Sequence, residues 1–82
     1  MELKDRLNIG KALIEILQEH TVKLKDPYDD ELPMFIKRAV MVQLRMKRFY
    51  HKHDEPPEML EQLETIEKIV KDMMALQNNR LQ

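Results

Sequence analysis

The sequence predicts an all-α fold in which three antiparallel helices form a small bundle. Apolar residues recur every three or four positions in three stretches of similar length, and prolines separate these stretches. The chain has 82 residues, of which 43% are hydrophobic and 35% charged, as expected for one small globular domain. The core of so short a chain is marginal, so we expect self-association to complete the bundle.

The first helix is predicted over residues 2–25. Its apolar face steps by three and four through Leu3, Leu7, Gly10, Ile14, Leu17, Thr21 and Leu24. Gly10 costs about 1 kcal/mol relative to alanine inside a helix. Either a local kink or the close approach of a neighbouring helix explains it. Asp26-Pro27 ends the helix, because a residue before proline is disfavoured in the helical region.

The second helix is predicted over residues 30–53. Asp29, Asp30 and Glu31 precede it, and acids at a helix start cap free N–H groups. Pro33 falls in its first turn, where proline is tolerated. The stretch is apolar over most of its circumference. We therefore expect both other helices, or a second chain, to pack on it.

A basic stripe follows this second helix and is the candidate partner-binding site. On a helical wheel its cations fall within about 100° of one another. The candidate residues are Lys37, Arg38, Met41, Arg45, Arg48 and Lys52. Residues 32–53 carry a net charge of about +6 between two acidic segments. The stripe could pair internally with the acids of residues 58–64, bind an acidic protein, or bind phosphates of a nucleic acid.

The third helix is predicted over residues 57–79. Its apolar seam contains Met59, Leu63, Ile66, Val70, Met73 and Gln77. Acids crowd its first turns and lysines follow, which suits the helix dipole. We expect residues 80–82 to fray.

The seven methionines divide into two groups. Met46, Met59 and Met73 fall on apolar seams and are predicted core residues. Met41 instead lies between Lys37 and Arg45 within the stripe. It is either a contact point for an amphipathic helix or a single exposed methionine.

The missing residue types argue against catalysis. The chain has no serine, no cysteine and one glycine, so nucleophilic triads and glycine-rich phosphate loops are absent. We expect no enzyme activity, no cofactor and no metal site. The cluster of His51, His53, Asp54 and Glu55 is interpreted as a solvated helix end, and His20 as a cap or surface residue.

These features favour a non-enzymatic helical protein–protein interaction module. It would be a homodimeric adaptor, inhibitor or regulator whose second helix binds a protein with an acidic or amphipathic helical surface. The alternative is a small nucleic-acid-binding regulator using the stripe, with Phe49 or Tyr50 stacking on bases. The sequence pI of about 6.3 weighs against that alternative.

No apolar run approaches about 18 residues, and the first residues are charged. We therefore expect a cytoplasmic protein with no membrane contact and no signal peptide. The small size and simple architecture suit an accessory protein of a bacterium or bacteriophage.

Overall fold

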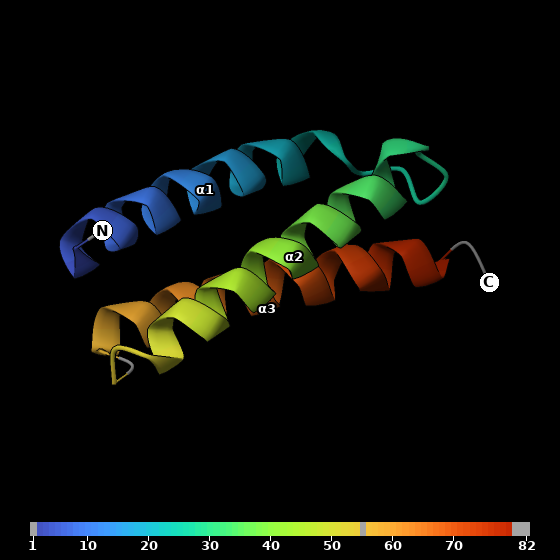
Figure 1. The fold of residues 1–82 in the computed structure, drawn as a ribbon. Coiled ribbons are helices and arrows are strands. Elements are labelled where there is room, and N and C mark those ends of the chain that lie inside the picture. Colours follow the sequence, from blue (N-terminus) through green and yellow to red (C-terminus); the bar gives the residue numbers. More distant parts are fainter. Residues whose placement is uncertain (1, 55, 80–82) are drawn as a thin grey trace.

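Three helices of nearly equal length make up the protein. The computed structural model describes residues 2–54 and 56–79 and contains α1 (Leu3–Lys23), α2 (Glu31–His51) and α3 (Pro57–Asn78). They form an elongated body of 43 × 19 × 17 Å, and α1 begins and α3 ends at opposite ends of its long axis (Figure 1). The predicted all-α class and three-helix bundle are confirmed. The predicted fraying of residues 80–82 falls outside the described residues.

The helix limits lie within two residues of those predicted. The first helix, α1, ends at Lys23 rather than at residue 25. The N–H of the C-cap residue Leu24 donates to the carbonyl oxygens of His20 and Thr21, at 3.2 and 3.3 Å. Likewise α2 ends at His51 rather than at residue 53. Pro57 occupies the first position of α3, where its fixed φ suits the helix and its missing N–H costs nothing. Differences of this size are usual because the last turn of a helix is weakly held.

One of the three predicted capping acids binds the backbone at the start of α2. The carboxylate of Asp29 accepts a hydrogen bond from the N–H of Glu31 at 2.9 Å. Asp30 is the N-cap residue but makes no side-chain cap hydrogen bond. Asp26 holds the preceding loop in the same way, by accepting from the N–H of Tyr28 at 2.9 Å. The acid cluster therefore shapes the α1–α2 connection as well as the helix start.

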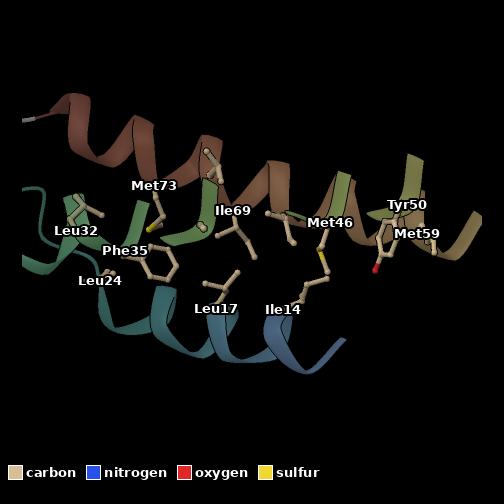
Figure 2. Close-up of a cluster of buried hydrophobic side chains, with 13 residues drawn as sticks. Ile14, Leu17, Leu24, Leu32, Phe35, Met46, Tyr50, Met59, Ile69 and Met73 are labelled. Atoms are coloured by element: carbon tan, nitrogen blue, oxygen red, sulfur yellow. The ribbon is translucent and has the colours of Figure 1, made fainter. Parts of the chain in front are cut away.

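The core is a single row of apolar side chains along the bundle. Figure 2 shows the row from Leu24 and Leu32 at one end to Tyr50 and Met59 at the other. The buried residues are Ile14, Leu17, Leu24, Leu32, Phe35, Ala39, Met46, Tyr50, Met59, Ile66, Ile69, Val70 and Met73. The predicted core methionines Met46, Met59 and Met73 are all among them.

The third helix, and not the second, is the central packing element. The backbone of α3 packs closely against both α1 and α2, whereas α1 and α2 approach each other less closely. Figure 1 shows α1 and α3 running in the same direction along the body and α2 running in the opposite direction. The expectation that both other helices, or a second chain, pack on α2 therefore holds in part: α3 packs closely on α2, whereas α1 meets it through side chains such as His20 against Phe35 and Arg6 against Phe49.

This arrangement leaves apolar side chains of α1 and α2 in water. Met34, Met41 and Leu44 of α2 are exposed, with 57, 44 and 51% of their surface accessible. Ile9 and Ile16 of α1 are 42 and 59% accessible. The second helix is thus less covered than its apolar circumference predicted, and three of these exposed residues, Ile9, Ile16 and Met34, line hollows at the junction of α1 and α2.

Candidate protein-interaction surface

A groove runs between α1 and α2. Near the start of α1 it widens to a hollow of about 230 Å³, lined by residues of these two helices alone. Its lining residues are Arg6, Ile9, Gly10, Leu13, Val42, Arg45, Met46, Phe49 and Tyr50. Two further hollows continue it toward the other end of α1, lined by Ile16, Glu19, His20, Lys23, Asp30, Glu31, Met34, Phe35 and Arg38. We call this line of hollows the α1–α2 groove.

The groove has an apolar floor and a cationic rim on its α2 side. Val42 and Phe49 are partly buried at its base, while Ile9 and Ile16 rise from α1 into solvent. Arg38 and Arg45 stand seven residues apart on α2, so they project from the same side of that helix. A groove of this kind fits an apolar helix face whose flank carries acids.

The six candidate residues predicted from the sequence separate into groups. All of them are exposed. Arg38 and Arg45 line the α1–α2 groove, whereas Arg48 and Lys52 line another hollow that borders Leu63 of α3. The sequence therefore identified the exposed cations but did not show that Arg38 and Arg45 border an apolar groove.

Met41 has an apolar neighbour on the same side of α2. Met34 lies seven residues earlier and is also exposed, so the two methionines share one helix side next to Arg38 and Arg45. Of the two interpretations of Met41, a single exposed methionine fits less well than part of a larger apolar surface.

The internal neutralisation of the stripe does not occur among the described residues. No ion pair in that part of the chain involves Lys37, Arg38, Arg45, Arg48 or Lys52; the ion pairs observed join His20 to Glu31 and Glu67 to Lys71. The acids at positions 58, 61 and 64 are exposed on α3. The charge segregation of the sequence thus survives folding as a cationic surface on α2.

Phe49 and Tyr50 are engaged within the protein. The guanidinium carbon of Arg6 lies 4.7 Å from the ring centroid of Phe49, which is a cation–π distance. The centroid of the His53 ring lies 4.4 Å from the centroid of the Phe49 ring. Tyr50 is 2% exposed. Tyr50 is thus buried and Phe49 is half-buried between Arg6 and His53, which counts against the proposed contact with nucleic-acid bases.

A polar cluster connects all three helices at the floor of the groove. The Tyr50 hydroxyl donates to Oε1 of Gln62 at 2.6 Å, and Nε2 of Gln62 donates to the carbonyl oxygen of Leu7 at 2.9 Å. A Cβ at Gly10 would overlap Oε1 of Gln62 and lie 2.6 Å from Cε of Met46. Close approach, rather than a kink, therefore explains the glycine. Sequence reasoning missed Gln62, although its position between Met59 and Ile66 places it on the buried face of α3.

Burial raises the pKa of the Tyr50 phenol above its ordinary value of 10.0, and the charge of Arg6 opposes part of that rise. The stability that the neutral phenol contributes is thus present below the unfolded-state pKa and is lost as the pH rises through the folded-state pKa. In Tyr28→Phe, titration of phenolate absorbance should report Tyr50 alone, with a higher pKa in the folded than in the unfolded protein. Equal values in the two states would contradict the burial of this hydroxyl.

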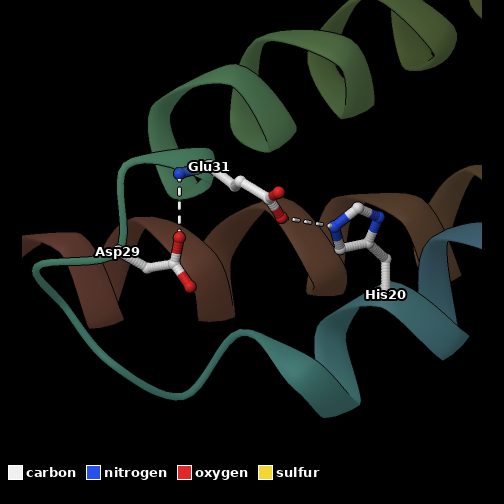
Figure 3. A network of polar contacts seen from close by, with 3 residues as sticks. All are labelled: His20, Asp29 and Glu31. Carbon is white, nitrogen blue, oxygen red and sulfur yellow. Dashed lines mark hydrogen bonds and ion pairs between the residues drawn. The ribbon is translucent and has the colours of Figure 1, made fainter.

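His20 joins the end of α1 to the start of α2. Its Nε2 lies 3.5 Å from a carboxylate oxygen of Glu31, and the backbone N–H of Glu31 donates a hydrogen bond to the carboxylate of Asp29 (Figure 3). The His20 ring lies 5.1 Å from the ring of Phe35. These contacts fit the predicted surface or cap role. Within the described ranges no three histidine or acidic residues are arranged to hold a metal ion, and Glu55 of the predicted cluster lies outside those ranges.

Comparison with known proteins found no matching family model, no matching curated protein and no matching solved structure. None of the helices in residues 2–54 and 56–79 combines the length and apolar character needed to cross a lipid bilayer.

Proposed function

We propose that the protein is a non-enzymatic helical interaction module, a small adaptor, inhibitor or regulator. Its binding surface is the cationic side of α2 together with the α1–α2 groove, and its partner is a protein with an acidic or amphipathic helical surface. The observation that carries this proposal is the cationic surface of α2, which no described acid of the chain neutralises. Homodimer formation and a cytoplasmic location stay predictions.

The composition of the surface supports this proposal. Apolar side chains that would otherwise be in contact with water favour association, and they contribute most of its free energy. The surrounding cations contribute less to affinity but select an acidic partner and orient it. Methionine is frequent on such surfaces because its flexible side chain adapts to a partner. Met34 and Met41 flank the arginines in this way.

Charge reversal on α2 tests the proposal. We expect immobilised Lys37→Glu/Arg48→Glu protein to lose the acidic protein that the wild type retains from extract of its source cell, because both cations become repulsive. The matched control is Lys4→Glu/Lys11→Glu, which makes the same charge change at exposed positions of α1. Quantitative mass spectrometry compares the proteins captured by the wild type, by the α2 variant and by the α1 control. Loss in both variants, or in neither, would contradict a role for the α2 surface.

Nucleic-acid binding is the second candidate function, favoured by the same unneutralised cations of α2. It predicts binding of duplex or single-stranded oligonucleotides that weakens steeply with salt and disappears in Arg45→Glu/Arg48→Glu. Absence of binding at low salt would exclude it. The internal packing of Phe49 and Tyr50 makes it the weaker candidate, since it leaves phosphate contacts without base stacking.

A further inference from the structure

We infer that a second copy of this chain occupies the α1–α2 groove, in a two-fold dimer whose axis runs along the helices. This rests on the proposed function, because it names one partner of the same surface. In this dimer, α1 of each copy lies over α2 of the other, and the two grooves close each other. Two features of the chain favour it once the register between the copies is fixed: the charges of the facing edges and the exposed apolar residues.

The register between the copies follows from the register within one chain. The rings of His20 and Phe35 lie at the same level of the bundle, and Gly10 lies level with Met46. Rotation about an axis parallel to the helices does not move them lengthwise. Each residue of α1 therefore faces, in the second copy, the part of α2 that is level with it in its own chain, and the two helices remain antiparallel.

Two pairs of opposite charges then meet at the facing edges. Asp5 and Glu19 are exposed on α1, 14 positions apart, on the side that borders the groove away from α2. On α2, Arg38 and Lys52 are exposed with the same spacing. In the inferred register Glu19 faces Arg38 of the second copy, and Asp5 faces Lys52. Each pair occurs twice because the interface is two-fold symmetric.

The exposed apolar residues also face each other in this register. Ile16, 59% accessible, lies opposite Met41 of the second copy, which is 44% accessible in the free chain. The side chain of Arg45 then lies across α1 of the other copy near Ala12, the small residue midway between Asp5 and Glu19. Its aliphatic part can pack on α1 while the guanidinium stays in water at the edge. The dimer thus covers Ile16 and Met41, two of the apolar side chains that α3 leaves exposed.

Light scattering coupled to size exclusion is the first test. Wild-type protein at high micromolar concentration should have the mass of a dimer, and Ile16→Lys should be monomeric because it buries a cation beside Arg38 and Arg45. The matched control, Val22→Lys, makes the same change at a position of α1 that is 66% exposed and does not line the groove. It should remain dimeric. Monomeric wild-type protein, or an equal effect of both variants, overturns the inference.

Exchange of charges tests the register. Glu19→Arg and Arg38→Glu should each weaken dimerisation about tenfold, since each replaces an attraction by a repulsion at both symmetric edges. Glu19→Arg/Arg38→Glu should restore most of the loss. Failure of the double variant to recover, while helical circular dichroism remains that of the wild type, overturns this register.

Cross-linking identifies the facing residues directly. The chain has no cysteine, so a thiol-reactive cross-linker can react only with a cysteine that is introduced at an exposed position. A mixture of Ile16→Cys and Met41→Cys proteins should give a covalent dimer with a short bismaleimide at a higher yield than either variant alone. Equal or absent yields overturn the inferred arrangement.

The outcomes distinguish this inference from the proposed function. A monomeric wild-type protein that still loses its captured partner on Lys37→Glu/Arg48→Glu overturns the dimer and keeps the interaction module, with a different protein on the cationic surface of α2. A dimer that captures no other protein keeps the inference and removes the heterologous partner.

Discussion

Replacing Ile66 by alanine is expected to lower the free energy of unfolding by about 2–5 kcal/mol. Ile66 is 0% exposed in α3, the helix that packs closely against both others. The cavity left by the missing carbons would loosen the contacts of two helix pairs. Small domains are stable by only about 5–15 kcal/mol, so the loss is a large part of the total. Guanidinium chloride unfolding followed by circular dichroism measures it.

Leu60→Ala is the matched control for this prediction. Leu60 lies on the same helix but is 45% exposed, so its truncation should change the stability by about 0.5 kcal/mol or less. Similar losses for both variants would mean that the buried face of α3 has been assigned incorrectly.

Gly10→Val is expected to destabilise the fold by about 1–3 kcal/mol, although valine is the better helix former in isolation. The new Cβ would overlap Oε1 of Gln62, which cannot move without breaking its hydrogen bonds to Tyr50 and Leu7. Thermal unfolding provides the measurement. Combining Gly10→Ala with Gln62→Ala should cost less than the sum of the single losses, because the obstructing amide is then absent.

Ala75→Val provides the control for the backbone effect. It introduces the same side chain at an exposed position of α3 and should cost no more than the difference in helix propensity, about 0.5 kcal/mol. A Gly10→Val protein as stable as Ala75→Val would show that the close approach at Gly10 is not required.

The helices and most of the core could be predicted from the sequence because their signals are local. Pro27 and Pro57 restrict the backbone at fixed positions, so two helix limits follow from them within two residues. Met46, Met59 and Met73 lie on seams with helical spacing, and such seams become buried whichever helix covers them. These conclusions need no knowledge of how the helices are arranged.

The arrangement of the helices could not be predicted, because it depends on which neighbouring helix covers each apolar face. Each helix has a seam, and a helical wheel does not show that α3 contacts both neighbours while α2 leaves Met34 and Met41 in water. Which charges come close together depends in the same way on how each helix is rotated about its own axis. A glutamine in an apolar seam was the available sign of the cluster around Gln62, but it does not indicate its partners.

The odd number of helices has a mechanical consequence. Because α1 begins and α3 ends at opposite ends of a 43 Å body, force applied between the two ends would slide α1 along α3 instead of peeling them apart one turn at a time. All contacts of this pair would resist together. Resistance to pulling would then be set by the unfolding rate rather than by the equilibrium stability.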